Sequence, residues 1–213
     1  LAIILLVVAI VCLSNVSKQK RLVEDDILVP EHYVDTTSIV KASDNFINGH
    51  EYVDLGLPSG LKWATCNVGA SKPEDDGNYY AWGETTTKKS KYTENNSKTY
   101  GKQMNDIKGN SQYDAARANW GGSWRLPTKS ELEELLNNCT WTWTAQNGVN
   151  GYKVTGPNGN SIFLPAAGDR IGLSLYDAGE YGEYWSSTPD ESDSIRAYFL
   201  IFNSGYQVVD CIL

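Results

Sequence analysis

From His50 onward, the chain is a succession of short apolar runs, most of them closed by glycine, asparagine or proline. Runs of this length fit strands, and the residues that separate them favour tight turns. The composition agrees, since the 213 residues include 19 Gly, 13 Tyr and 7 Trp but a single Met. The sequence therefore predicts an α+β fold of short, twisted antiparallel strands with about two helices and long loops.

Nine of these apolar runs are candidate strands. Two pairs of residues between them, Asn147-Gly148 and Asn158-Gly159, provide the positive φ angles that tight hairpin turns require. The candidate strands are 51–55, 61–68, 79–82, 140–144, 152–155, 161–164, 184–186, 197–202 and 207–212.

One segment, residues 127–138, has the pattern of an amphipathic helix. Thr128 can cap its first turn while Glu131, three residues on, reaches back to the cap, which makes a capping box. Apolar residues at the i, i+3 and i+4 positions then share one face, namely Leu132, Leu135 and Leu136. A shorter helix is expected at residues 113–119.

Residues 1–13 are uncharged and almost wholly aliphatic. A spanning helix needs about 20 residues, whereas an apolar stretch of this length is typical of a signal peptide. Three export arrangements fit: a cleaved signal, a lipid-modified Cys12, or an uncleaved anchor. A buried strand or core helix is the other alternative. We expect residues 1–17 to be a signal peptide or a membrane or lipid anchor, and the protein to be secreted or exposed on the cell envelope.

Residues 18–48 are polar and charged and carry little strand signal. They predict a spacer that leads to a folded domain at residues 49–213. The final apolar run reaches residue 213 without a polar tail, which is typical of a domain cut short at its C-terminus.

Export would place Cys66, Cys139 and Cys211 where disulfides persist. A Cys66–Cys139 bridge is one arrangement, and small buried thiols are the other. The sequence contains no Cys-x-x-Cys pair and no Cys/His pattern with ligand spacing, so we expect no metal site.

The chain carries 18 basic and 26 acidic side chains, a net charge of −8. Such a surface repels phosphate backbones, so nucleic acid is not expected as a partner. Two histidines and the lack of a Gly-x-Ser-x-Gly motif leave little basis for serine or histidine chemistry. We therefore expect a binding module that is not an enzyme and that needs no cofactor.

The tryptophans are expected mainly in the core. Trp141 and Trp143 alternate with threonines and so share one face of a strand; that face is either core or an open sugar platform. Five others have small neighbours that suit closely packed rings: Trp63, Trp82, Trp120, Trp124 and Trp185.

Five motifs, in this order, resemble the Fibrobacter succinogenes major paralogous domain family. The resemblance spans about residues 50–210 and implies a C-type-lectin-like fold in secreted or surface-attached proteins, many of them lipoproteins or adhesin-like. That fold is related to formylglycine-generating domains and to the variable proteins of diversity-generating retroelements. The motifs lie at residues 51–70, 80–84, 124–128, 163–168 and 184–188.

This chain departs from the resemblance in two respects. It has no closing strand with a Ser-Val-Arg-Pro-like ending after Leu213, which an intact member would carry. It also lacks the Glu-Pro-Asn and Gln-Pro-Asp motifs of calcium-dependent lectins, so calcium-dependent sugar binding is not implied.

The C-terminal residues 170–213 have the composition of a binding face. They hold seven acidic and two basic side chains, interspersed with tyrosines. Tyrosines and short polar side chains on loops give a large contact area at low entropic cost; an acidic solubilising surface is the alternative. The candidate ligand-binding residues are Tyr176, Asp177, Glu180, Glu183, Asp190, Asp193, Tyr206 and Gln207.

We expect an adhesin-like, extracellular recognition module that binds a protein or glycan ligand at a cell surface. It would meet a membrane only through its N-terminal segment. Two alternatives stay open. One is an enzyme of the formylglycine-generating or glycan-hydrolase type, with Cys211 or paired acids in the reaction. The other is a structural subunit of a surface filament.

Overall fold

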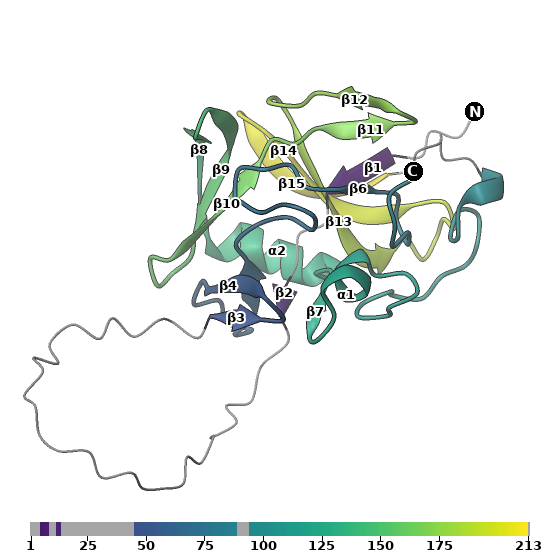
Figure 1. Ribbon diagram of the computed structural model, residues 1–213, viewed down its shortest axis with the longest axis horizontal. Helices are drawn as coiled ribbons and strands as arrows, with labels where there is room; N and C mark the ends of the chain where they lie inside the picture. Colours follow the sequence, from purple (N-terminus) through teal and green to yellow (C-terminus); the bar gives the residue numbers. More distant parts are fainter. Residues whose placement is uncertain (1–4, 9–11, 14–44, 89–93, 213) are drawn as a thin grey trace, which may run out of the picture.

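The computed structural model describes residues 5–8, 12–13, 45–88 and 94–212, and it arranges them as three sheets with two α-helices (Figure 1). The strands pair antiparallel almost throughout, and the α+β class predicted from the sequence is confirmed. Neither helix in the described part of the chain is long and apolar enough to cross a membrane.

The largest sheet carries the C-terminal strands of the domain, within residues 169–212. Its strands lie in the order β12-β11-β1-β13-β14-β15, and β6 pairs beside β1. Their bounds are β1 (Leu5–Val8), β6 (Tyr79–Tyr80), β11 (Asp169–Ile171), β12 (Ser174–Tyr176), β13 (Gly182–Pro189), β14 (Ala197–Asn203) and β15 (Tyr206–Ile212).

Two smaller sheets flank it. One has the order β10-β9-β8 and the other the order β3-β4-β5-β2-β7. The hairpin between β8 and β9 turns at Asn147 and Gly148, which both have positive φ, as the sequence predicted. The strands are β2 (Cys12–Leu13), β3 (Phe46–Ile47), β4 (His50–Asp54), β5 (Lys62–Ala64), β7 (Trp124–Arg125), β8 (Thr140–Gln146), β9 (Val149–Thr155) and β10 (Ser161–Pro165).

All nine candidate strands are present, although the run at 61–68 forms only the short β5. The strands that sequence reasoning missed are mostly of two to four residues, such as β7 and β11. A segment of that length has too few residues to show an alternating pattern. Only its partners in the sheet make it a strand.

Both helices were predicted. The α2 helix (Lys129–Asn138) follows the cap Thr128, and the capping box with Glu131 is complete. The α1 helix (Ala115–Trp120) starts two residues later than expected, because the side chain of Asp114 caps it by accepting from the Arg117 amide at 3.0 Å. Capping thus sets where each helix begins.

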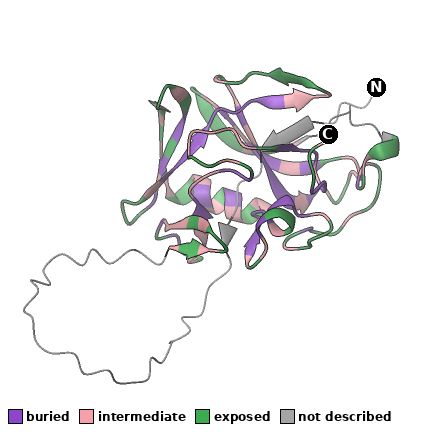
Figure 2. Cartoon of the chain, viewed as in Figure 1, coloured by how far each residue is buried: buried purple, intermediate pink, exposed green. Residues whose placement is uncertain are grey.

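The α2 helix covers one face of β13, β14 and β15. Its Leu132 and Leu135 are fully buried in one core cluster with Tyr184, Leu200 and Phe202, and the purple stretches of Figure 2 mark this interior. The expected tryptophan core is confirmed. Trp63, Trp120, Trp124 and Trp185 are buried, Trp82 is half-buried, and Trp141 and Trp143 pack against the same core through Tyr152 and Phe202.

The N-terminal apolar segment contributes two strands. The backbone of β1 pairs in parallel with β13 and antiparallel with β6 and β11, and β2 pairs with β5 and β7. This backbone pairing is that of the strand alternative for the segment. A signal peptide or anchor at residues 1–17 and a lipid on Cys12 stay predictions, since the side chains there lie outside the described residues.

Two expectations need correction. The Cys66–Cys139 bridge is not formed, because both side chains are free thiols: Cys66 contacts the carbonyl of Ala70, whereas Cys139 packs against the α2 core. Most of the spacer at 18–48 lies outside the described residues, but β3 begins at Phe46. Described strands therefore precede the expected domain start at residue 49.

A buried ion pair joins β7 to the first turn of α2. Arg125 is 3% exposed and donates to both carboxylate oxygens of Glu131, at 2.7 and 2.8 Å. The Glu131 carboxylate also accepts from the Thr128 amide at 2.8 Å. Burial alone would raise the pKa of Glu131, but the hydrogen bonds from Arg125 and Thr128 prevail and lower it to about 2. The pair therefore stabilises the folded protein while Glu131 is charged.

Replacing this carboxylate should be costly. We expect Glu131→Gln to lower the free energy of unfolding by about 3 kcal/mol at neutral pH, because it leaves the buried Arg125 without its countercharge. The contribution of Glu131 is present above its ordinary pKa near 4.5 and is lost as the pH falls towards about 2. Urea unfolding at both ends of this pH range measures the effect.

Glu133→Gln is the matched control. Glu133 is half exposed and lies 3.8 Å from the exposed Lys129, so its loss should change stability by less than about 0.5 kcal/mol. Equal losses in the two variants would show that the Arg125–Glu131 pair has no special weight.

Candidate functional site

The eight candidate residues do not form one site. Six lie around the start of β13 and of β15, whereas Asp190 and Asp193 lie in the turn after the far end of β13. The eight residues of β13 separate the two groups, a span of about 24 Å. The structure therefore does not bring Asp190 and Asp193 together with the other candidates, and their part in ligand binding stays a prediction.

The contacts of Asp190 and Asp193 are local. Asp190 accepts from the amide of Ser192 at 2.8 Å, and Asp193 accepts from the amide of Ile195 at 3.1 Å and pairs with Arg196 at 3.3 Å. These interactions shape the β13–β14 turn. These two acids were grouped with the other candidate residues only because they are close to them in sequence.

Gln207 is also separated from the other candidates. Its register partner Phe202 lies in the core on the side of α2. Adjacent strand residues point to opposite faces, so Tyr206 points to the other face together with Val208. Tyr206 and Gln207 therefore cannot serve the same face of β15.

The remaining acids gather where β11 and β13 diverge. Gly168 and Gly182 form a parallel bridge. Asp169 and Glu183 each follow one residue later, so they project to the same side. Past this point the backbone of β1 lies between the two strands. We call Asp169, Glu183 and the nearby Asp177 the acidic fork.

Both glycines at the base of the acidic fork are required by close approach. A Cβ on Gly168 would lie 2.0 Å from the carbonyl oxygen of Tyr176, and the residue has a positive φ of +66°. A Cβ on Gly182 would lie 2.1 Å from the ring of Phe202. Glycine at these positions lets the loop and the strand approach closely enough to bring the acids together.

Asp169 is the residue that sequence reasoning missed. It is 4% exposed, and its Oδ2 atom has no hydrogen-bond partner among the described residues. The Oε2 atom of the half-buried Glu183 is also buried and without a partner there. Buried polar atoms are nearly always hydrogen-bonded. An acid directly after the apolar 163–168 motif is the sequence signal that could have pointed to it.

Two carboxylates of the acidic fork, Asp169 and Glu183, have a raised pKa. Burial, together with the charges of Asp169 and Asp177, raises the pKa of Glu183 to about 7. Burial and the charge of Asp177 also raise the pKa of Asp169. The cluster therefore holds negative charge at a free-energy cost that a cation would relieve.

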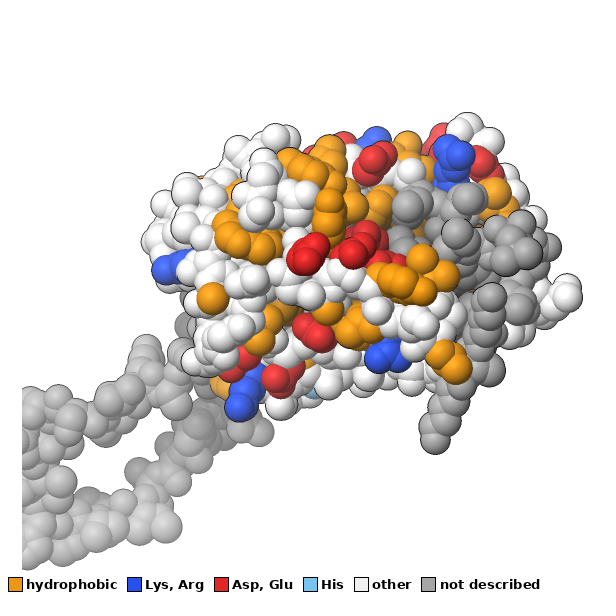
Figure 3. All heavy atoms as spheres, turned by 90° about the horizontal axis from the view of Figure 1, so that it is seen from above, with side chains coloured by type: hydrophobic (Ala, Val, Ile, Leu, Met, Phe, Trp, Pro, Cys, Tyr) orange, Lys and Arg blue, Asp and Glu red, His pale blue; other side chains and the backbone are white. Residues whose placement is uncertain are grey.

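Exposed apolar side chains surround this acidic region. Figure 3 views the molecule from the β12 side and shows acidic side chains lying between hydrophobic ones. Of the six large apolar side chains exposed in the described part of the chain, five lie on or beside β12 and on β15. They are Leu173, Leu175 and Tyr176 on or beside β12, and Tyr206 and Val208 on β15.

Tyr176, Glu183, Tyr206 and Val208 form one face. Tyr176 is the register partner of Asp169, and Glu183 aligns with Val208 through Ile201. Burial, then the charges of Tyr181 and Glu183, raises the pKa of Tyr206, which places its ring near the acidic fork. We call these four residues, with the acidic fork, the C-terminal face.

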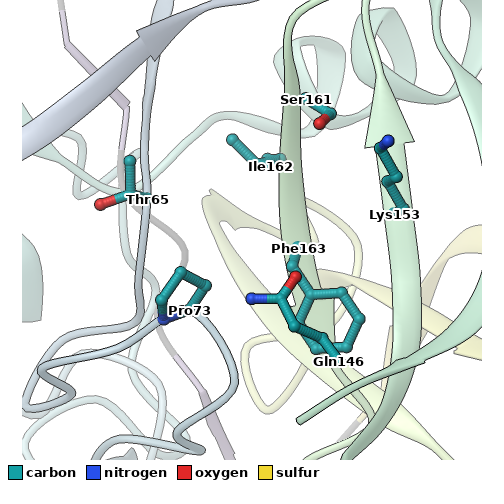
Figure 4. Close-up of a pocket in the computed structure, with 7 residues that line it drawn as sticks. All are labelled: Thr65, Pro73, Gln146, Lys153, Ser161, Ile162 and Phe163. Carbon is teal, nitrogen blue, oxygen red and sulfur yellow. The ribbon is translucent and has the colours of Figure 1, made fainter.

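A separate hollow lies between β5 and the β8–β10 sheet (Figure 4). Its volume is about 300 Å³, and polar and apolar side chains share its wall. Gln146 donates to Glu74 at 3.2 Å, so its carbonyl oxygen stays available to a ligand. The hollow has the size for a small polar molecule. It is lined by Thr65, Pro73, Gln146, Lys153, Ser161, Ile162 and Phe163.

Among the described residues, no three His, Cys, Asp or Glu side chains are placed to hold a metal ion. The acidic fork and the hollow can instead bind by charge, hydrogen bonds and apolar contact. Contacts of these kinds are typical of sites that bind a ligand.

Comparison with known proteins decides the family. Residues 56–210, more than half of the chain, match the Lcl C-terminal domain. The chain belongs to the Lcl C-terminal domain family. This membership is consistent with a ligand-binding module of the C-type-lectin-like kind, while the narrower Fibrobacter resemblance stays a prediction. No curated protein and no solved structure matches the chain.

The raised pKa of Glu183 predicts a pH-dependent cost to folding. Its ordinary pKa is 4.5 and its folded value about 7, so stability is reduced as the pH rises through this interval. We expect Glu183→Gln to raise the free energy of unfolding above about pH 7 by up to about 3 kcal/mol. The gain should shrink as the pH approaches 4, where Glu183 is neutral in both states.

Chemical denaturation of the wild type and the variant across this pH range measures the difference. Glu180→Gln, which removes an exposed acid three residues after Asp177, is the control and should show no such trend. A constant difference between wild type and Glu183→Gln at every pH would contradict the assignment.

Proposed function

We propose that this chain is a non-enzymatic recognition module exposed at a cell surface, and that it binds its ligand through the C-terminal face. One observation carries the proposal: three of the six large exposed apolar side chains of the described residues, Tyr176, Tyr206 and Val208, lie on the same face as the acidic fork. Contiguous exposed apolar patches with a polar border are typical of interaction sites.

The scaffold beneath the face is rigid, which suits recognition. The Tyr184 hydroxyl donates to the Pro165 carbonyl at 2.6 Å, and the ring stacks on Phe202. The buried rings of β13 and β14 thus support the side chains of the opposite surface. Preorganised aromatic contacts lose little entropy on binding.

The chemistry of Cys211 supports a non-enzymatic function. Burial and the neighbouring Asp190 raise the pKa of the Cys211 thiol to about 12. The nucleophile in cysteine chemistry is the thiolate, which such a site disfavours. A formylglycine-generating reaction at Cys211 therefore lacks the activated thiol that we would expect.

The ligand is proposed to be a protein or a glycan. The apolar and acidic C-terminal face fits a protein surface, whereas the hollow beside Lys153 has the dimensions for a sugar ring. Protein is our first proposal, because the exposed apolar area lies on the C-terminal face and not at the hollow.

The test is binding of the full chain to arrays of extracellular proteins and glycans. We expect the triple variant Tyr176→Ser, Tyr206→Ser and Val208→Ser to lose at least about tenfold in protein binding, because truncated aromatic anchors typically remove the larger part of the affinity. All three side chains are exposed, so the melting temperature should stay within about 3 °C.

Phe46→Ser is the matched control, since Phe46 is the sixth exposed apolar side chain and lies on β3. It should leave binding unchanged. Unaltered binding by the triple variant would refute the C-terminal face. Glycan binding that Lys153→Ala abolishes and the triple variant retains would instead assign recognition to the hollow.

A further inference from the structure

Two buried carboxylate oxygens in the acidic fork lack partners among the described residues. They are Oδ2 of Asp169 and Oε2 of Glu183. Asp169 is only 4% exposed, so water does not solvate its carboxylate freely. A buried, unpartnered carboxylate is among the costliest features of a protein interior. The presence of two such oxygens therefore indicates that a group of a ligand pairs with them.

The charges around these oxygens are almost all negative. Asp177 faces both acids from the turn after β12, and the Tyr206 phenol lies near Tyr181, Glu183 and Asp210. No Lys or Arg of the described residues forms an ion pair with Asp169, Asp177 or Glu183.

The nearest basic residue in sequence is directed elsewhere. Arg170 follows Asp169 on β11, and adjacent strand residues point to opposite faces. Its guanidinium lies 4.9 Å from the centre of the Tyr79 ring. Arg170 therefore stacks on an aromatic ring and leaves the acidic fork with its charge uncompensated.

We infer that the acidic fork is a socket for one organic cation, the ammonium or guanidinium group of a basic side chain on a protein ligand. This inference rests on the proposed function and names the chemistry that its ligand must present. Carboxylates of Asp169 and Glu183 would accept hydrogen bonds from the cation, and Asp177 would add charge at the rim.

The surrounding surface suits a lysine or arginine side chain. Tyr176 and Tyr206 are each nearly half exposed beside the acids, and aromatic faces attract cations. Val208 offers an apolar surface to the aliphatic stem of such a side chain. A bare metal ion fits less well, because the described residues contain no cluster of three or more ligands placed to hold one.

The experiment titrates the full chain with n-butylammonium chloride at about pH 8 and follows backbone amide resonances. We expect saturable shifts centred on residues 168–170 and 182–184, and none with 1-butanol, which has the same stem without charge. The double variant Asp169→Asn and Glu183→Gln should weaken the binding at least about tenfold.

The double variant Asp190→Asn and Asp193→Asn removes the same formal charge at the far end of β13. It should bind n-butylammonium as the wild type does. If both double variants bound n-butylammonium equally weakly, overall charge would explain the effect, and the inference of a cation socket would be overturned. If calcium chloride produced the same resonance shifts at a lower concentration, the acidic fork would be a metal site, and the inference of an organic cation would be overturned.

The pH dependence separates the socket from a shared proton. Protonation of Glu183 should weaken n-butylammonium binding between about pH 8 and pH 5.5, with the carboxylates of Asp169 and Asp177 and the phenol of Tyr206 facing it. If no shift occurs at either pH, a proton held between Asp169 and Glu183 explains the unpartnered oxygens and the inference is wrong.

The array measurements distinguish a failure of the cation socket from a failure of the proposed recognition function. Protein binding that survives Asp169→Asn with Glu183→Gln but not the triple variant would leave the C-terminal face intact and refute the socket alone. Both double variants are first checked by thermal unfolding. Glu183→Gln by itself provides a folded fallback, because its expected effect on stability above pH 7 is favourable.

Discussion

Buried aromatic side chains that donate hydrogen bonds to loop carbonyls hold this fold together. The Tyr79 hydroxyl donates to the carbonyl of Ala167 at 2.5 Å, and the Tyr184 hydroxyl donates to that of Pro165 at 2.6 Å. Short strands leave many backbone carbonyls outside any ladder, and burial is tolerable only when each finds a donor. These two bonds fix the backbone directly before Asp169, so the position of the acidic fork depends on rings packed in the core.

The same device recurs across the domain, which explains its aromatic composition. The Trp185 indole donates to the carbonyl of Tyr80 at 3.0 Å, and the Trp124 indole donates to that of Ile47 at 2.9 Å. Tyrosine and tryptophan combine a large apolar body with one polar donor. A single side chain can therefore fill the core and satisfy a distant loop. The scaffold becomes stiff without long strands or many helices, and its outer surface is left to vary.

The local features were accessible from sequence, and the long-range ones were not. The α2 helix and its Thr128–Glu131 cap follow from residues a few positions apart. Strand alternation, applied to β15, would already have separated Tyr206 from Gln207. The acidic fork depends on the bridge between Gly168 and Gly182, a pairing that no local pattern encodes. The hollow beside Lys153 is likewise assembled from segments distant in sequence.

The cysteines have a practical consequence. Cys66, Cys139 and Cys211 are all half-buried free thiols, and none of these three contributes a cross-link. A reducing agent therefore has no disulfide to break among these three cysteines. Dithiothreitol can keep these three thiols reduced, and they offer three native positions for isotopic reporters.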